Sequence, residues 1–233
     1  MANREWLAAL SLLIIALKAS CDYADSETPM TDDSITIALP EPQYDGDVSI
    51  EETLLRRRSI RDYTNETLTL PELSQLLWAA QGITDPRGFR TAPSAGATYP
   101  LEVYAVAGDV EGITDGIYRY RPHQHELVKV LDGDKREVLA QAALNQQFIA
   151  QAPLDIVITA IYERTTGRYG DRGIRYVHME AGHAAQNIYL QAVALNLGTV
   201  VIGAFYDNPV KEILELADDE TPLYIIPVGR MVD

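Results

Sequence analysis

The chain has 233 residues, of which 47% are hydrophobic, and a formal net charge of −15. The hydrophobic fraction is enough for a substantial core, whereas the acidic balance excludes nucleic acid as the main partner, because phosphate backbones need basic surfaces. Cys21 is the single cysteine, which excludes intrachain disulfides and cysteine-based metal clusters.

Residues 1–21 form a signal-like apolar segment. The run from Trp6 to Leu17 carries no charge, but its 12 residues fall short of the roughly 20 that a membrane-spanning helix needs. An Ala-Ser-Cys sequence that ends at Cys21 is similar to the end of a bacterial lipoprotein signal. We therefore expect an extracytoplasmic or membrane-anchored protein with a tether through Cys21. The alternative is a cytoplasmic protein in which this segment packs as an apolar helix on the domain or on a partner subunit.

Residues 22–38 are interpreted as an acidic linker. They are rich in aspartate and glutamate and poor in large apolar residues, which is typical of a solvated segment. Residues 39–233 then form one domain of ordinary size, and we expect its folded part to begin near Ile35 or Pro40.

Two capping boxes predict the first helices of the domain. A Ser-x-x-Glu box at Ser49 begins a helix over 50–57, and a Thr-x-x-Glu box at Thr69 begins a helix that ends near Gly82.

Residues 56–63 read RRRSIRDY and concentrate four arginines where the first helix ends. One interpretation is structural, because cations at a helix C-terminus offset the macrodipole. The alternative is an anion site, because guanidinium groups bind phosphate in a bidentate manner and keep their charge when partly buried.

The middle of the domain alternates strands and helices. Short runs rich in β-branched and aromatic residues predict strands, and Pro122 to His125 predicts a hairpin turn. The expected elements are strands over 101–107, 117–121 and 126–131, a helix over 135–148 and a strand over 155–161.

The longest expected helix covers residues 175–197. Much of its circumference is apolar, which favours a place in the core or in a subunit interface. A strand over 199–205, a helix from Asn208 to about 217 and a strand over 223–230 follow. This mixed order predicts an α+β fold around one sheet.

Two loops rich in small residues are candidate ligand contacts. Residues 90–100 read RTAPSAGATYP, a composition that lets a backbone approach a flat ligand closely, although a plain turn is the alternative. Gly203 and Ala204 interrupt the run VVIGAFYD, which indicates a close approach by a ligand or, alternatively, a bulge or a tightly packed core strand.

Five motifs in order resemble the FMN-dependent nitroreductase superfamily, and within it the SagB/ThcOx-type dehydrogenase branch. They are RRSIRDY, APSAGATYPLEVY, RYGDRGIRYVHMEAGHAAQNIYLQA, GTVVIGAF and PLYIIPVGR, and the resemblance runs from about residue 39 to 230. It implies a nitroreductase-like α/β sandwich with a mostly antiparallel central sheet flanked by helices, and an intertwined homodimer with FMN at the interface.

The resemblance also implies cofactor-binding roles. Arg57 and Arg230 would hold the FMN phosphate, Arg58 and Ser59 belong to the same N-terminal motif, and Arg61 would lie near the pyrimidine edge of the flavin. The loop beside the ring and the strand end that faces flavin N5 would consist of Pro93, Ser94, Ala95 and Gly96 and of Ile202, Gly203 and Ala204.

Arg168 and Tyr169 are the catalytic candidates. They match a Lys-Tyr pair that azoline-oxidising members of the branch carry ahead of the central helix, but arginine cannot serve as a base near neutral pH. Tyr169 is a candidate acid or substrate contact, with a surface aromatic in a loop as the alternative. His178 and His183 are five residues apart and do not share a helix face, so no metal site is expected.

The expected function is therefore an FMN-dependent oxidoreductase. It would transfer a hydride from a donor such as NAD(P)H to a small conjugated acceptor, nitroaromatic or quinone-like, by a ping-pong mechanism in a homodimer. One alternative is a SagB/ThcOx-type dehydrogenase that oxidises a peptide-derived azoline ring. Others are a flavin-binding protein without turnover and a structural domain that has lost the cofactor.

Overall fold

The structure is a computed structural model that describes residues 35–232. The signal-like segment, Cys21 and most of the acidic linker lie outside the described residues. Within the described range, no helix combines the length and the apolar character that a membrane span requires.

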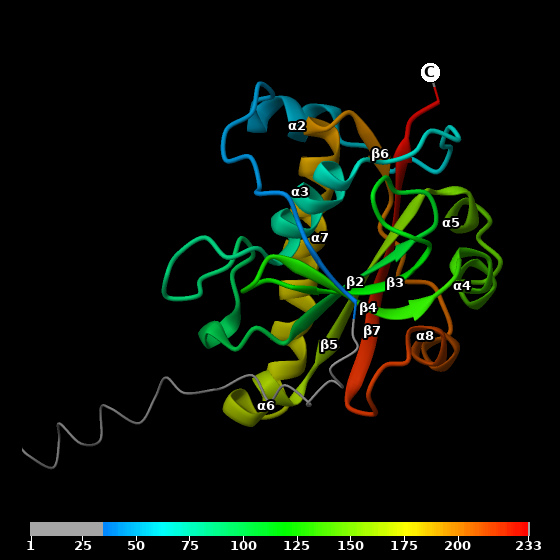
Figure 1. The fold of residues 1–233 in the computed structure, drawn as a ribbon. Helices are drawn as coiled ribbons and strands as arrows, with labels where there is room; N and C mark the ends of the chain where they lie inside the picture. The colour runs from blue at the N-terminus through cyan, green and yellow to red at the C-terminus, as the bar shows by residue number, and fades with distance from the viewer. Residues whose placement is uncertain (1–34, 233) are drawn as a thin grey trace, which may run out of the picture. The chain divides into compact units, whose positions relative to one another are not determined.

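One seven-stranded sheet runs through the described residues (Figure 1). Its strands are β1 (Thr36–Ala38), β2 (Leu101–Ala107), β3 (Gly116–Arg121), β4 (Glu126–Asp132), β5 (Leu154–Ile161), β6 (Leu197–Thr199) and β7 (Glu220–Arg230). Their order across the sheet is β1-β4-β3-β2-β5-β7-β6, and every pair of neighbouring strands is antiparallel. The α+β class and the mostly antiparallel sheet are confirmed.

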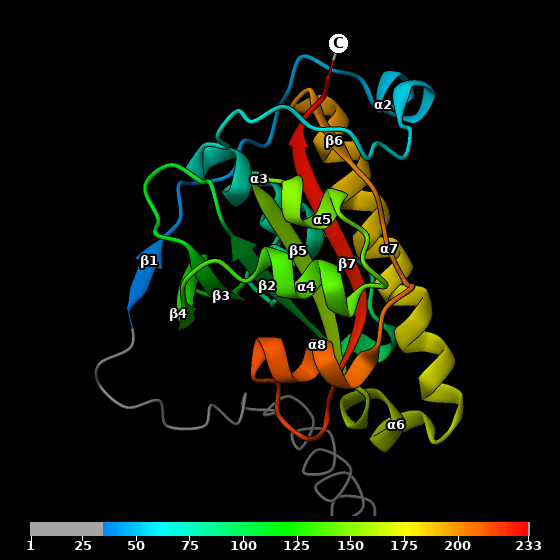
Figure 2. The ribbon, with the colours of Figure 1, turned by 90° about the vertical axis from the view of Figure 1, so that its right-hand side faces the viewer.

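Helices cover both faces of this sheet, as Figure 2 shows. One hydrophobic cluster joins α3 and α7 to the sheet, and a second joins α4, α5 and α8 to the opposite face. The described helices are α2 (Ile50–Arg56), α3 (Leu70–Gln81), the 3-10 turn η1 (Ala95–Ala97), α4 (Arg136–Ala142), α5 (Phe148–Gln151), α6 (Glu163–Tyr169), α7 (Arg172–Ala194) and α8 (Asp207–Leu214).

The long helix α7 is the central support of one layer. Its inward stripe consists of Val177, Ala181, Ala184, Ile188 and Ala192, none of them more than 2% exposed. The small alanines let the helix lie close to the sheet, and α6 contacts one end of it while α2 contacts the other (Figure 1). The predicted core role of this segment is confirmed.

Local capping explains where the first helices begin. The Ser49 hydroxyl accepts the Glu52 N–H at 3.1 Å at the start of α2. At α3 the capping box is complete, because the Thr69 side chain accepts from Glu72 and the Glu72 carboxylate accepts the Thr69 N–H at 2.9 Å.

Several predicted boundaries were wrong. Residues 36–38 were included in the linker over 22–38 but form β1 and pair with β4, which agrees with the earlier of the two expected domain starts, near Ile35. The helix expected over 135–148 divides into α4 and α5, because Leu144 and Asn145 adopt left-handed φ values of 61° and 59°, which no α-helix continues through.

The strand expected over 199–205 is also shorter than predicted. Strand β6 ends at Thr199, and beyond it Ile202 pairs with Ile225 in an isolated bridge. The chain leaves the sheet here to reach α8. Helix α6 was not predicted, because its sequence ERTTGRY contains a glycine and two threonines and has no side-chain cap.

Candidate functional site

The RRRSIRDY segment leaves α2 and lies against the C-terminal part of α7 and the ends of β6 and β7. The Ile60 N–H donates to the Thr199 carbonyl at 2.9 Å, and the Thr64 N–H donates to the Arg230 carbonyl at 2.9 Å. These backbone bonds hold the arginine motif beside the strand ends.

Tyr189 on α7 connects this motif to the glycine-containing segment after β6. Its hydroxyl lies 3.0 Å from the Ser59 hydroxyl and accepts the Val201 N–H at 2.9 Å. The Arg57 guanidinium carbon lies 5.0 Å from the centre of the Tyr189 ring. Tyr189 lies in the segment that was expected to be an apolar helix over 175–197, and nothing in that pattern indicated this polar role.

The four arginines of the motif have different partners. Arg56 pairs with Glu52 at 2.8 Å, and Arg58 donates to the carbonyls of Leu55 and Arg57 at 3.0 and 2.7 Å. Arg56 and Arg58 therefore contact the C-terminal end of α2. Within residues 35–232, Arg57 and Arg61 are in no ion pair, and Arg61 lies 5.8 Å from the Phe148 ring. Two cations are thus left for an anionic ligand.

Arg230, the other predicted phosphate ligand, pairs with Glu72 through both nitrogens. The Nη1–Oε1 distance is 2.7 Å and the Nη2–Oε2 distance is 3.1 Å. The same carboxylate caps α3 at Thr69. A phosphate role for Arg230 therefore requires the guanidinium to share or exchange this partner.

The segment that follows β6 presents its backbone at the surface. The N–H and carbonyl of Ile202 both bond to Ile225, at 2.9 and 3.0 Å, whereas Gly203 and Ala204 are exposed. The Ala204 carbonyl accepts the side-chain amide of Gln146 at 3.0 Å. We call this segment of Ile202, Gly203 and Ala204 the Gly203 edge, and it is open to a flat ligand.

The loop over residues 93–99 has an unusual backbone. Gly96, Ala97 and Tyr99 adopt φ values of 64°, 52° and 43°, a left-handed region that costs a non-glycine residue about 1 kcal/mol or more. The Ser94 hydroxyl accepts the Tyr99 N–H at 2.9 Å and so closes the loop on itself. Such strain persists only where surrounding contacts impose it.

Helix α6 supplies those contacts. Arg168 Nη1 donates to the Gly96 carbonyl at 3.0 Å, and the Thr98 and Thr165 hydroxyls lie 2.8 Å apart. Arg168 and Tyr169, the predicted catalytic pair, thus lie against the predicted flavin loop, and Tyr169 is the last residue of α6 rather than part of a loop.

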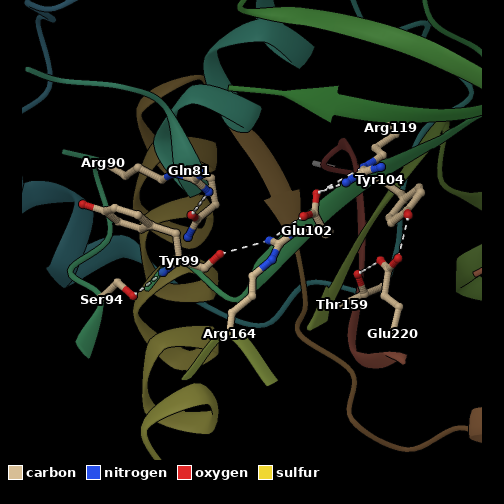
Figure 3. Close-up of polar contacts among 10 residues, drawn as sticks. All are labelled: Gln81, Arg90, Ser94, Tyr99, Glu102, Tyr104, Arg119, Thr159, Arg164 and Glu220. Carbon is tan, nitrogen blue, oxygen red and sulfur yellow. Dashed lines mark hydrogen bonds and ion pairs between the residues drawn. The ribbon is translucent and has the colours of Figure 1, made fainter. Parts of the chain in front are cut away.

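Arg164 fixes α6 to the sheet and to the same loop, as Figure 3 shows. Its Nη1 lies 2.6 Å from a Glu102 oxygen and 3.1 Å from the Tyr99 carbonyl. Glu102 on β2 pairs in addition with Arg119 on β3 at 2.9 Å. The sheet, the helix and the loop therefore share one ionic network.

Glu180 on α7 is a buried acid near this loop that the sequence analysis missed. It is 2% exposed, and neither of its carboxylate oxygens has a hydrogen-bond partner among the described residues. Burial raises the pKa of Glu180 to about 7, although the Ser94 hydroxyl and the Arg90 guanidinium act in the opposite direction. Its place among apolar residues of the long helix was the only signal in the sequence.

The predicted site residues thus form two groups. The arginine motif and the Gly203 edge gather at the level of Tyr189, whereas the 93–99 loop and α6 lie at the level of Glu180. Nine residues of α7 separate the two levels, about 13 Å along the helix axis. No group of three or more potential metal ligands occurs within residues 35–232, and His178 instead bonds the Tyr162 hydroxyl at 2.6 Å.

Two solved structures that are named as nitroreductases have the same fold. One from Anabaena variabilis has a TM-score of 0.75 at 33% identity and covers 85% of this chain, which spans 42% of that longer chain. One from Ralstonia eutropha has a TM-score of 0.73 at 31% identity, with 85% of this chain and 90% of that chain covered.

More distant relatives carry other names. A Bacillus subtilis protein named FMN reductase (NAD(P)H) is 27% identical over 192 residues, 77% of this chain and 63% of that protein. The microcin B17-processing protein McbC of Escherichia coli is 27% identical over 174 residues, 71% of this chain and 64% of that protein. This chain spans less than two thirds of the length of both.

A protein of Methanocaldococcus jannaschii that is named as a nitroreductase is 53% identical over 201 residues, 86% of this chain and 99% of that protein. Residues 54–230 match the model of the nitroreductase family. The match includes the arginine motif, the 93–99 loop, α6, α7 and Arg230, and the chain therefore belongs to the nitroreductase family.

Proposed function

We propose that this protein is an FMN-dependent oxidoreductase that takes a hydride from NAD(P)H and passes it to a small conjugated acceptor, nitroaromatic or quinone-like, in a ping-pong cycle. The observation that carries the proposal is the pair Arg57 and Arg61, two cations with no carboxylate partner among residues 35–232. Arg57 lies over the Tyr189 ring, and the Tyr189 hydroxyl accepts the Val201 N–H, two residues before the exposed Gly203. The family and the name of the Bacillus subtilis relative support it.

The residues present fit this cofactor. Arg57 and the Ser59 hydroxyl can hold the phosphate through charge-assisted hydrogen bonds, and Arg61 is left for the pyrimidine edge of the flavin. The Gly203–Ala204 backbone lets a flat ring approach closely. FMN, when bound, supplies the two-electron chemistry. The Gly203 edge would hold the ring, and the charge of Arg61 near the ring would favour its reduced, anionic form.

We propose further that two copies of the chain complete the site. Large apolar side chains are exposed on α2 and α7, among them Leu55 at 74% and Met179 at 52%, and a second copy of the chain would cover them. The two groups of site residues lie at different levels of α7, so a second copy would supply the 93–99 loop beside the arginine motif of the first. The proposed partner is therefore a second copy of the same chain, in a homodimer, as the resemblance implies.

An azoline dehydrogenase is the second candidate function. The likeness to the microcin B17-processing protein favours it, and Tyr169 lies at the predicted flavin loop. Arg168 speaks against it, because the guanidinium stays charged near neutral pH and donates to the Gly96 carbonyl.

The proposed cofactor site is tested by titrating protein freed of FMN with FMN and following flavin fluorescence. We expect Arg57→Ala and Arg61→Ala to weaken FMN binding about tenfold each, with the circular dichroism spectrum unchanged. Arg56→Ala is the matched control, because Arg56 lies in the same arginine run but pairs with Glu52. Equal losses in all three variants would mean that the run acts through its general charge.

The membrane tether through Cys21 rests on the sequence. We expect the full-length chain to fractionate with membranes and Cys21→Ser to be released. A Cys21→Ser variant that stays with the membrane would contradict lipid anchoring.

A further inference from the structure

A surface of arginines and tyrosines lies where α6 meets α7. We call it the α6–α7 patch, and it consists of Arg168, Tyr169, Arg172, Arg175 and Tyr176. Residues 163–175 hold four arginines against Glu163 and Asp171, a local charge of +2 in a chain of −15.

The three arginines of the patch have no carboxylate partner among the described residues. Within residues 35–232, Arg168, Arg172 and Arg175 are exposed and occur in no ion pair. Elsewhere in that range, arginines with a carboxylate within 4.0 Å are Arg56, Arg87, Arg119, Arg121, Arg136, Arg164 and Arg230. In so acidic a protein, three exposed arginines without a carboxylate partner form a local cationic surface that an external anion can neutralise.

Aromatic rings are interleaved with these cations. Arg168 lies 5.5 Å from the Tyr169 ring centre and Arg172 lies 5.8 Å from the Tyr176 ring centre. The Tyr169 and Tyr176 rings meet edge to face at 5.3 Å. A planar guanidinium beside an aromatic face suits a ligand that carries both an anionic group and a flat ring.

The patch directly adjoins the loop that we assign to the flavin. Arg168 bonds the Gly96 carbonyl, and a β-carbon added at Gly96 would lie 2.5 Å from the Tyr169 hydroxyl. Because Arg164 ties α6 to Glu102, the patch is held in place before any ligand arrives.

We propose that the α6–α7 patch binds the anionic group of a planar co-substrate, so that the enzyme selects aromatic molecules that carry phosphate or carboxylate. The inference rests on the proposed function, because it assigns a specificity to the same site. Two sources share this chemistry: the phosphates of a nicotinamide dinucleotide and the carboxylate of an aromatic acceptor.

The test measures binding to the purified full-length protein by calorimetry. The probes are NADP⁺ and 4-nitrobenzoate, with the neutral 4-nitrobenzyl alcohol as reference. The variant is Arg172→Gln/Arg175→Gln, which leaves the loop contact of Arg168 intact. The control is Arg121→Gln/Lys135→Gln, which removes the same charge from β3 and from the start of α4.

We expect the patch variant to bind at least one anionic probe about tenfold more weakly, to lose most of the salt dependence of that binding, and to bind the neutral probe as the wild type does. Weaker binding of NADP⁺ would identify the nicotinamide donor as the ligand of the patch, and weaker binding of 4-nitrobenzoate would identify the aromatic acceptor. The inference is overturned if neither anion binds the wild type, if both bind the patch variant unchanged, or if the control loses as much.

The two proposals can fail separately. Calorimetry with NADP⁺ and 4-nitrobenzoate requires no turnover, so patch-dependent binding to a protein that lacks flavin would contradict the proposed function alone. Flavin reduction by NAD(P)H with unchanged probe binding in the patch variant would contradict this inference alone. If the wild type is a dimer and the patch variant is a monomer that binds the anions normally, the arginines contact the second copy of the chain and not a co-substrate.

Discussion

At the scale of single residues, the polar side chains of α7 decide what the site can do. Tyr189 joins the arginine motif to the Gly203 edge. Glu180 places a buried carboxyl beside the Ser94 loop, where burial holds its pKa at about 7. An acid with such a pKa changes charge within the physiological range, which is a property of functional sites more often than of structural ones.

Glu180 predicts a pH dependence of stability. Below pH 4.5, its ordinary pKa, the carboxyl is neutral in both the folded and the unfolded state. Between pH 4.5 and about 7 the unfolded chain releases the proton while the folded protein keeps it. The free energy of unfolding therefore falls as pH rises, by about 3 kcal/mol in total.

Glu180→Gln should remove this fall. Chemical denaturation at pH 5 and pH 8 measures it, and the variant is expected to be the more stable protein at pH 8. Glu51→Gln, at an exposed position of α2, is the control and should follow the wild type. If Glu180→Gln loses stability between pH 5 and pH 8 as the wild type does, burial of Glu180 is not the cause.

Gly96 makes a second prediction at this scale. Gly96→Ala adds a left-handed alanine, which costs about 1 kcal/mol, and it also forces the new methyl group against Tyr169. Gly133→Ala shares the left-handed backbone (φ 82°) but meets no atom within 4 Å. FMN affinity should fall for Gly96→Ala and not for Gly133→Ala. Adding Tyr169→Phe to the Gly96→Ala variant should restore part of the affinity, because it removes the hydroxyl that the new methyl group meets. Equal FMN affinities in the two alanine variants would contradict this contact between residues 96 and 169.

At the scale of elements, α6 determines the conformation of the 93–99 loop. The helix contributes Arg164, Thr165 and Arg168 to contacts with the loop. Neither element has strong local preferences, since α6 lacks a side-chain cap and the loop contains left-handed non-glycine residues. The conformation of α6 and that of the loop therefore depend on each other and on Glu102.

Removing the Arg164 side chain should release the loop. Hydrogen exchange of the amides of 94–99, followed by mass spectrometry, should rise at least tenfold in Arg164→Ala, and Arg164→Lys should restore part of the protection. Arg119→Ala is the control, because it also takes one partner from Glu102 but does not touch the loop. Equal exchange in Arg164→Ala and Arg119→Ala would show that the ionic network stabilises the sheet without ordering the loop.

The predictable elements were those with strong local signals. Thr69 and Glu72 carry their capping box in four residues, and the strand over 101–107 has the predicted bounds. The break between α4 and α5 depends on distant partners, since the Tyr206 N–H bonds the Ala142 carbonyl and Gln146 bonds Ala204. No local pattern encodes such contacts.

The same distinction applies to the site. The arginine motif and the 93–99 loop could be proposed as candidates because arginine runs and small-residue loops are visible along the chain. The burial of Glu180 and the pairing of Arg230 with Glu72 arise from segments that are 86 or more residues apart in sequence, and so only the folded structure reveals them.

At the scale of the whole molecule, the proposed site is incomplete in one copy. We expect Leu55→Glu and Met179→Glu to turn the homodimer into monomers, because each places a charge in a proposed apolar interface. Val138→Glu on α4, at a position that is 43% exposed, is the control. Sedimentation velocity checks the outcome, and a wild-type protein that sediments as a monomer would contradict the two-copy site.

The measurement that tests the flavoenzyme proposal most directly is the visible absorption spectrum of the purified protein, before and after NADPH or NADH is added without air. We expect a yellow protein whose flavin absorption bleaches with the nucleotide. A yellow protein that stays oxidised would contradict NAD(P)H as the donor. A colourless protein that cannot be reconstituted with FMN would contradict FMN as the cofactor.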